Sequence, residues 1–468
     1  MEHVDVVVVG GRVAGSAMAI NLARGGLSVV LLERAAMPSD TLSTHTVQEL
    51  PGFGRLGLLD AMLDTGAPPL MRSTMWVEEL DLSVEHPGQP WLSIRRLTLD
   101  PLVLAAAVGA GADVRTQCKV VGVDRTGDRV SGVSYRRPDG TESRLSCRLV
   151  VGADGRSSAV ARLVGAARYN VTSNERAAVW NYFLDVPAPA EFFYCRRGRD
   201  LLLAAPTDSG RTMLAVQPDT AHAPRFRAPG AVQDAFRAGA LPWGEQRRDW
   251  TELLADARPD GPARMVRGYQ CFFRRSAGPG WALVGDAGHV KDVVTGQGLS
   301  DAVRQGERLS ARVLESWSGS DRALDSAVQV WWRRRDRDGA PMYWLSQDMG
   351  RSGPVPPLYA GFFRTVAGSE ELKLGLQEVL AQQQPVRRFL SLRRLTLIVL
   401  AFLSTAGPGR LDRLREVGRT LALEVRRRWA SVRPRYDRTG EPPEVDETPA
   451  RPVPIRRLRD AVSPQEEM

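Results

Sequence analysis

The chain has 468 residues, of which 43% are hydrophobic and 25% charged, enough to bury a large core in two closely joined domains. Its formal net charge is +9 at pH 7, concentrated after residue 384, and no nucleic-acid-binding motif accompanies the basic segment, which argues against a nucleic acid partner. Its cysteines show no paired spacing, so they indicate neither a disulfide framework nor a metal site and fit a cytoplasmic protein: Cys118, Cys147, Cys195 and Cys271.

The first predicted element is an apolar strand over residues 6–9, which runs into a glycine-rich turn and then a helix over residues 16–24. This arrangement is typical of dinucleotide sites, where the amides at the helix N-terminus receive a pyrophosphate. The turn consists of Gly10, Gly11, Arg12, Val13, Ala14 and Gly15. Arg12 replaces the middle glycine of the usual pattern, so either the turn is wider or the guanidinium itself reaches a phosphate oxygen.

A second strand over residues 27–32 ends at Glu33, about twenty residues after the turn, where the dinucleotide pattern has an acidic residue for the ribose hydroxyls. Glu33 and the adjoining Arg34 are therefore candidate cofactor residues. The alternative is a glycine turn in an ordinary strand–helix unit. Two later motifs make that alternative weaker.

Both later motifs are apolar strands that end in glycine and aspartate. Residues 149–151 lead into Gly152-Ala153-Asp154-Gly155, and residues 281–284 lead into Gly285-Asp286. A helix with apolar residues at helical spacing follows, and it opens on the turn Gly296, Gln297, Gly298 and Leu299. The amides and positive dipole end of this helix suit negative charge, such as that on the pyrimidine edge of a reduced flavin.

The order of these motifs resembles the single-component FAD-dependent monooxygenases of the p-hydroxybenzoate hydroxylase type. The glycine turn, Asp154-Gly155 and Gly285-Asp286 stand at the matching places, and Arg96 begins a segment similar to the family's Arg-x-x-Leu-Asp element beside the FAD. The resemblance covers about residues 4 to 345. It departs at Arg12 and at Val293, where the family has a proline before the Gly-Gln-Gly turn.

The resemblance implies FAD as the cofactor, with NADPH or NADH and O2 as co-substrates. A flavin C4a-hydroperoxide would pass one oxygen atom to an aromatic or apolar small molecule, in secondary metabolism. The nicotinamide cofactor would visit the flavin without a Rossmann domain of its own. Because the cofactor carries the hard chemical step, the protein has to bind, orient and exclude water.

The expected fold is α/β (α+β), with a Rossmann-like FAD-binding domain, an inserted antiparallel-sheet substrate domain and a helical C-terminal extension. Short strand-like runs between Gly, Pro and Asp turns indicate the antiparallel sheet. We expect the FAD-binding domain in residues 1–169 and 275–345, the substrate domain in 170–274, the extension in 346–433 and a disordered tail in 434–468.

Candidate substrate contacts are Trp180 and Tyr182, among several aromatic residues that either line a pocket or fill the core of the sheet: Phe192, Phe193, Tyr194, Phe272 and Phe273. Candidate proton relays are His45 and His289, because histidine titrates near neutral pH. Each is equally well read as a hydrogen-bonded structural residue. No pattern of metal ligands, and no Ser-His-Asp or cysteine nucleophile signature, is present in the sequence.

Three other functions remain open. A geranylgeranyl-reductase-like saturase of isoprenoid double bonds would share the glycine turn. A flavin halogenase would share the fold, but the W-x-W-x-I-P element and active-site lysine of that class are missing. A non-enzymatic flavoprotein is the third. Consumption of NAD(P)H coupled to oxygen uptake would separate a monooxygenase from a saturase or a binding protein.

The C-terminal extension contains an apolar run over residues 395–403, preceded by four arginines, and a strongly basic helix-like run over residues 411–429. The apolar run is too short to span a bilayer, which takes about twenty residues. It could fill a core groove, form an oligomer contact or attach to a membrane surface. Peripheral membrane contact and oligomer contact through residues 385–433 are therefore both expectations.

Overall fold

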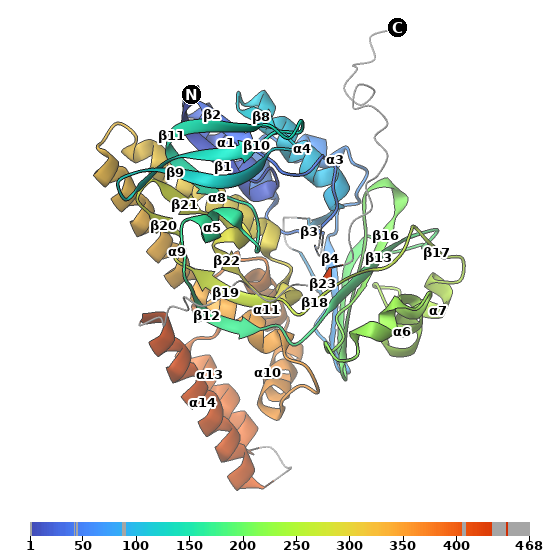
Figure 1. Cartoon of the computed structure of the whole chain (residues 1–468). Helices are drawn as coiled ribbons and strands as arrows, with labels where there is room; N and C mark the ends of the chain where they lie inside the picture. Colours follow the sequence, from blue (N-terminus) through green and yellow to red (C-terminus); the bar gives the residue numbers. More distant parts are fainter. Residues whose placement is uncertain are drawn as a thin grey trace.

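The structure is a computed structural model, which describes residues 2–41, 43, 45–86, 90–404, 409–432 and 446–447. Figure 1 shows two sheets side by side, with helices around them and a helical hairpin that projects from the body. The fold is the expected mixture of a dinucleotide-binding sheet and a second, largely antiparallel sheet. The site lies where the two sheets meet.

In the described part of the chain, the first sheet has eight strands around a parallel centre. The parallel pairs join, in spatial order, β21 (Trp281–Leu283), β11 (Glu142–Gly152), β1 (Glu2–Val9), β2 (Val29–Leu32) and β8 (Asp113–Arg115). Antiparallel partners extend it: β9 (Lys119–Thr126), β10 (Arg129–Arg136) and β20 (Ala277–Gly278). Val6 and Val8 pack into one core cluster and Val7 into another, so β1 is buried on both faces, as a continuous apolar run requires.

Helices cover this sheet and bring the later motifs to it. The long helices are α1 (Val13–Arg24), α4 (Arg96–Gly109), α8 (Gly298–Ser316) and α9 (Asp321–Gly350), and α1 packs against α8 and α4. Shorter helices are α2 (Leu50–Arg55), α3 (Leu59–Leu63) and α5 (Ala159–Leu163), and the 3-10 turns are η1 (Asp208–Gly210), η2 (Ala223–Arg227), η3 (Gly285–Ala287) and η4 (Val293–Thr295).

The second sheet is the expected substrate sheet, but it draws on more of the chain than residues 170–274. Four expected strands are present as β13 (Ala178–Leu184), β14 (Glu191–Arg197), β15 (Asp200–Pro206) and β16 (Thr212–Val216). The fifth expected run, residues 265–273, is divided between β18 (Arg264–Arg267) and a strand of another sheet, and β17 (Arg258–Pro259) was not expected. Strands from the first part of the chain join them: β4 (Arg72–Val77), β5 (Leu80–Asp81) and β6 (Val84–Glu85). The boundary at residue 169 is thus wrong for this segment, because β4 pairs in parallel with β14.

The two faces of the substrate sheet have different tasks. Phe193 points to a separate core formed with α6 (Ala231–Gly239) and α7 (Trp250–Leu253), which lie beyond the sheet in Figure 1. Its neighbour Tyr194 points the other way, into the core shared with the first sheet. Alternation along a strand thus produces one structural face and one face toward the site.

Smaller sheets connect the two domains. One is formed by β12 (Arg168–Ser173), β19 (Gln270–Arg274) and β22 (His289–Val290), and the other by β3 (Thr46–Val47) and β7 (Leu92–Ser93). Because each links segments far apart in sequence, the domains are tied at several points.

The C-terminal extension is helical, as expected: α10 (Pro357–Ala367), α11 (Glu370–Leu380), α12 (Val386–Phe389), α13 (Leu392–Ser404) and α14 (Arg410–Val432). Among the described residues, no helix is both long enough and apolar enough to cross a membrane. Of the expected disordered tail, 434–468, only Asp446–Glu447 are described; they form β23, which pairs with β18. The rest of that prediction lies outside the described residues.

The core beyond the substrate sheet predicts a stability effect. Trp250 is 2% exposed and its ring contacts Phe193 and Phe236. Trp250→Ala should lower the free energy of unfolding by about 3–5 kcal/mol, because the truncation leaves a cavity. Val330→Ala, at a side chain that is 58% exposed, should change it by no more than about 0.5 kcal/mol. Denaturant unfolding followed by far-UV circular dichroism measures the free energy of unfolding of both variants. Equal losses in the two variants would contradict the burial of Trp250.

Candidate functional site

Three chain segments meet at the glycine turn. A Cβ added to Gly15 would lie 1.8 Å from the carbonyl oxygen of Gly10, and one added to Gly10 would lie 2.5 Å from the carbonyl oxygen of Ala153. Gly10 also has a φ of +107°, which side chains disfavour. The end of β1, the start of α1 and the end of β11 can therefore touch through their backbones. The free amides at the start of α1 lie at this junction, where an anion can bind.

The side chain of Arg12 extends from the glycine turn to other segments of the chain. Its backbone is extended, with φ −83° and ψ −173°, which any residue adopts. Its guanidinium donates to Asp100 Oδ2 at 2.9 Å and to Ser39 Oγ at 3.1 Å. Arg96 also pairs with Asp100, at 2.7 Å, so one carboxylate holds both arginines beside the start of α1. The two guanidinium groups give this region positive charge.

Glu33 is fixed at the end of β2 by backbone donors. Its Oε2 accepts from the Gly11 amide at 2.6 Å, and its Oε1 accepts from the Ala35 amide at 2.7 Å. Each carboxylate oxygen can accept a second hydrogen bond, so the side chain can still bind ribose hydroxyls. Arg34, beside it, is exposed.

The motif at the end of β11 serves first to hold a turn. The Asp154 carboxylate accepts hydrogen bonds from Ser158 Oγ and from the amides of Ala159 and Val160, so it caps α5. Burial raises the pKa of Asp154. Gly155 lies in the same turn, after which Arg156 lies close enough to Asp286 for their charges to interact. The turn thus delivers a cation next to the late acidic motif.

Asp286 differs from Asp154 in its surroundings. The side chain is exposed although the neighbouring Gly285 and Ala287 are buried. Within the described ranges, no residue donates a hydrogen bond to its carboxylate. Burial of the surrounding region raises the pKa of Asp286, and the charge of Arg156 opposes this. A carboxylate held at a strand end, beside α1 and open to a hydroxyl donor, fits the ribityl chain of FAD.

The turn before α8 is anchored through a buried glutamine. Gln297 Nε2 donates to the Leu380 carbonyl at 2.6 Å, and its Oε1 accepts from Lys291 at 2.6 Å. Lys291 also pairs with Asp301 at 2.8 Å. Gln297 therefore joins the turn to the end of α11, and the amides of Gly298 and Leu299 at the start of α8 are left to meet a ligand.

A small cavity of about 30 Å³ lies against this turn. On one side are the turn residues Val294, Thr295 and Gly296, and on the other are side chains of the substrate sheet and α11. The remaining lining is mostly apolar or aromatic: Thr46, Gln48, Ser73, Met75, Trp91, Phe192, Tyr194, Leu203, Met349, Gln377 and Leu380. Gln48 Oε1 and Thr295 Oγ1 are buried polar atoms without a hydrogen-bond partner among the described residues.

α11 closes the cavity through a buried polar contact. Gln377 Nε2 donates to Ser73 Oγ at 3.0 Å and lies 3.1 Å from His86 Nε2. Ser73 Oγ and His86 Nε2 are 2.7 Å apart. Burial lowers the pKa of His86 to about 4, so the imidazole is neutral near pH 7. The C-terminal extension is thereby attached to β4 beside the cavity.

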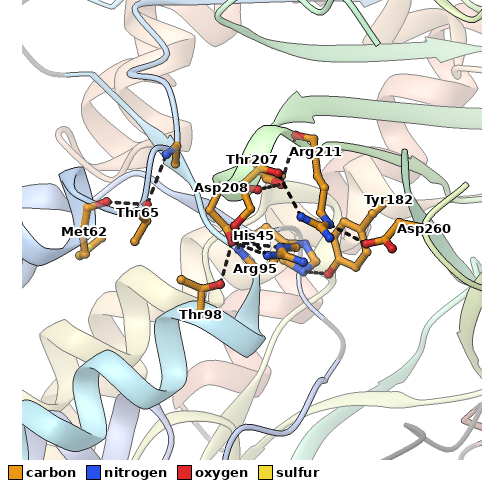
Figure 2. Close-up of polar contacts among 12 residues, drawn as sticks. His45, Met62, Thr65, Arg95, Thr98, Tyr182, Thr207, Asp208, Arg211 and Asp260 are labelled. Carbon is orange, nitrogen blue, oxygen red and sulfur yellow. Dashed lines mark hydrogen bonds and ion pairs between the residues drawn. The ribbon is translucent and has the colours of Figure 1, made fainter. Parts of the chain in front are cut away.

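His45 and Tyr182 form a buried pair, with 2.6 Å between His45 Nε2 and the Tyr182 hydroxyl (Figure 2). Burial and the charge of Arg96 lower the pKa of His45 to about 3, and burial raises the pKa of Tyr182. The imidazole is therefore neutral and the phenol protonated near pH 7, and one hydrogen bond joins the Tyr182 hydroxyl and His45 Nε2. His45 Nδ1 has no hydrogen-bond partner in the described part of the chain.

Charged groups surround this pair. Arg95 donates to both Asp208 oxygens, through its amide at 2.8 Å and through its guanidinium at 2.7 Å, as Figure 2 shows. Arg264 pairs with Asp40 at 2.9 Å. The Arg95–Asp208 pair joins the substrate domain to the start of α4, and the Arg264–Asp40 pair joins it to the segment after β2.

His289 lies elsewhere. Its ring stacks on Phe273 at 4.4 Å between centroids and lies 5.9 Å from the ring of Tyr343. Burial lowers the pKa of His289 to about 3. A neutral ring stacked between β19 and α9 favours a packing role over a proton relay.

The structure separates the candidate substrate residues. Trp180 lines a second, smaller cavity of about 10 Å³, whereas Tyr182 lines neither cavity. Phe192 and Tyr194 line the larger cavity, but Phe193, Phe272 and Phe273 are core residues. The residues beside the cavity that were not predicted from the sequence include Gln48, Thr295 and Gln377. The position of Gln48 directly after the His45 segment was a sequence signal that could have identified it. No sequence signal indicated Gln377.

Comparisons with known proteins identify the family and the fold of the chain. A profile of the FAD binding domain matches residues 3–330. Digeranylgeranylglycerophospholipid reductase 2 of Methanothermobacter thermautotrophicus is 37% identical over 174 residues, 34% of this chain and 42% of that protein. Rifampicin monooxygenase of Streptomyces venezuelae is 26% identical over 335 residues, 67% of this chain and 65% of that protein. The chain thus spans less than two thirds of either relative.

A solved flavoprotein/dehydrogenase from Cytophaga hutchinsonii has the same fold, with a TM-score of 0.68 at 17% identity over 86% of this chain and 99% of that one. The fold predicted from the sequence is therefore confirmed. The profile covers well over half of the chain, and its cofactor is the one that the three motifs predicted. The chain belongs to the FAD binding domain family, whose profile matches residues 3–330.

Proposed function

We propose that this protein is an NAD(P)H-dependent monooxygenase that hydroxylates an aromatic or otherwise apolar small molecule. The observation that carries the proposal is the buried, mostly apolar cavity between the turn at Gly296 and the aromatic face of the substrate sheet. The cavity lies at the place where the reacting edge of a flavin would face a substrate.

Each part of FAD has a matching group in this proposal. The pyrophosphate would bind at the start of α1, through the amides of Val13, Ala14 and Gly15, with Arg12 and Arg96 supplying positive charge. Glu33 would accept from the adenosine ribose, and Asp286 from the ribityl chain. The backbone of Gly296, Gly298 and Leu299 would meet the flavin ring, supported by Gln297. Gly155 would approach through its backbone, while Asp154 holds the turn.

Bound FAD would supply electron transfer from NADPH or NADH and the activation of O2. Substrate, O2, NAD(P)H and one proton would give hydroxylated substrate, NAD(P)⁺ and water. The residues of the chain would keep bulk water away, since reduced oxygen species are otherwise lost as hydrogen peroxide. Met75, Phe192 and Leu380 provide such an apolar wall.

The cavity also constrains the substrate. Gln48 Oε1 accepts a hydrogen bond and Thr295 Oγ1 can accept or donate one, so the substrate would carry at least one hydroxyl or amine group. An apolar cavity that binds benzene has a volume of about 150 Å³. A cavity of about 30 Å³ must therefore enlarge, which a shift of α11 at Gln377 and Leu380 would allow.

The neutral pair of His45 and Tyr182 is proposed to orient the substrate sheet. The depressed pKa of His45 speaks against a role as general base near pH 7. Trp180 would contact a substrate that extends into the second cavity. His289 is proposed as a packing residue.

A second function, reduction of an isoprenoid double bond, is favoured by one observation. The matched stretch of the digeranylgeranylglycerophospholipid reductase has the higher identity of the two relatives. That match covers 42% of the reductase, whereas the monooxygenase match covers 65% of its protein. A reductase product would gain two hydrogen atoms and no oxygen atom.

The reaction can be tested with isotopically heavy oxygen gas. We expect NADPH or NADH to bleach the flavin absorbance anaerobically, and a hydroxylated product to carry one heavy oxygen atom per NAD(P)H consumed. The substrates to screen are hydroxyl- or amine-bearing aromatic compounds, with an isoprenoid alkene in parallel. Reduction of the alkene without oxygen uptake would replace this proposal with the saturase.

Asp286→Ala should weaken FAD binding by about ten- to a hundredfold, because a hydrogen bond to a charged group contributes roughly 1.5–3 kcal/mol. The melting temperature of the apoprotein should not fall, since no described residue donates to this carboxylate. Titration of the apoprotein with FAD measures the affinity, and Asp128→Ala, at the exposed turn between β9 and β10, is the matched control. Wild-type affinity in the Asp286 variant would remove the ribityl assignment.

Glu33→Gln should behave differently from the Asp286 variant. It should weaken FAD by a similar factor, about tenfold or more, and it should also destabilise the apoprotein by roughly 1–3 kcal/mol. The reason is that the NH2 group of the introduced glutamine side chain would face one of the two backbone amides that donate to the Glu33 carboxylate in the wild type. Denaturation of the FAD-free protein separates the two effects. A loss of FAD affinity without loss of apoprotein stability would show that these two amides do not anchor Glu33.

A further inference from the structure

The hairpin of α13 and α14 is attached to the body by one face. Phe402, Val417 and Leu358 form a small core between the hairpin and α10. Arg427 binds Asp348 with both terminal nitrogens, at 2.7 and 2.6 Å, and Glu416 accepts from the Leu358 amide at 2.9 Å. Residues 416, 417 and 427 recur at helical spacing, so they define the inner face of α14.

Away from this face, α14 presents a row of large, exposed apolar side chains. They fall at intervals of three, seven, four and four residues, which places them on one side of the helix. This row, called the α14 stripe here, consists of Leu411 (70% exposed), Leu414 (54%), Leu421 (60%), Val425 (66%) and Trp429 (61%). On α13, Leu397 and Leu400 are also more than half exposed.

Positive charge flanks the stripe. The ranges of α13 and α14 contain nine arginines and three acidic residues. At 3.6 residues per turn, Arg415, Arg419 and Arg426 fall along one edge of the stripe and Arg428 along the other. Asp412 pairs with Arg415 at 3.2 Å and Glu424 with Arg428 at 3.2 Å, whereas Glu416 lies on the inner face. The pattern is an apolar stripe with basic borders.

We propose that α13 and α14 dock on the surface of an anionic lipid bilayer. The α14 stripe would lie among the headgroups and upper acyl chains, and the bordering arginines would contact lipid phosphates. The described helices are not able to cross a membrane, so the hairpin lies on the surface. A second copy of the chain fits less well, because pairing two stripes would bring their basic borders together.

The test is vesicle flotation with the full-length, FAD-loaded protein. Vesicles of phosphatidylcholine alone and of phosphatidylcholine with phosphatidylglycerol are compared at low and high salt. We expect the protein to float with the anionic vesicles, to ignore the neutral ones and to be released by salt. Failure to float with anionic vesicles at low salt would overturn the proposal.

Paired variants identify the surface. Leu421→Glu with Val425→Glu, and separately Arg419→Glu with Arg426→Glu, should each reduce the floated fraction at least tenfold, with bound flavin unchanged. The matched controls are Val108→Glu with Val330→Glu, at side chains 56% and 58% exposed on α4 and α9, and Arg333→Glu with Arg337→Glu on α9. The controls should float like the wild type. Equal loss in the controls would assign binding to general charge and contradict the hairpin assignment.

Light scattering without vesicles tests whether the α14 stripe binds a second copy of the chain. We expect the wild type and the stripe variant to have the same molar mass. A wild-type dimer that becomes a monomer on changing Leu421 and Val425 would assign the stripe to a second copy of the chain and overturn the membrane proposal.

Discussion

The close contact of backbones at the glycine turn is the constraint on which the rest of the structure depends. Gly15 packs on the Gly10 carbonyl, and Gly10 packs on the Ala153 carbonyl, at distances that leave no room for a Cβ. This contact brings the start of α1 to the ends of β1 and β11. Asp286 follows the neighbouring strand β21, so the anion site and the open carboxylate lie at one edge of the sheet. A side chain at Gly15 would displace the whole arrangement.

The second domain completes the site from the opposite side. Alternation along β14 sends Tyr194 toward the first sheet and Phe193 into a separate core, so one face stays rigid while the other lines the cavity. The buried contact of Gln377 with Ser73 then seals the cavity with a helix from the C-terminal extension. The extension therefore has two tasks: α11 covers the site, and the hairpin provides the proposed docking surface.

Sequence patterns predicted the parts of the site that are local. Gly10, Glu33 and Asp286 each stand at a strand end, and a strand end is visible as an apolar run that meets glycine or an acidic residue. The contribution of β4 was missed because its partner β14 lies over a hundred residues away, and parallel pairing leaves no local signal. The pairing of Arg12 with Asp100 and the contact of Gln377 with Ser73 were missed for the same reason. His289 shows the limit of residue type alone, since its buried ring is stacked on Phe273.

The most direct test is an experimental structure of the protein with FAD bound. We predict the pyrophosphate at the start of α1, the ribityl chain within hydrogen-bond distance of Asp286, and the flavin ring between the turn at Gly296 and the cavity that Phe192 and Tyr194 line. A flavin ring bound away from this turn, with Asp286 contacting no part of the cofactor, would contradict the assignment of the site.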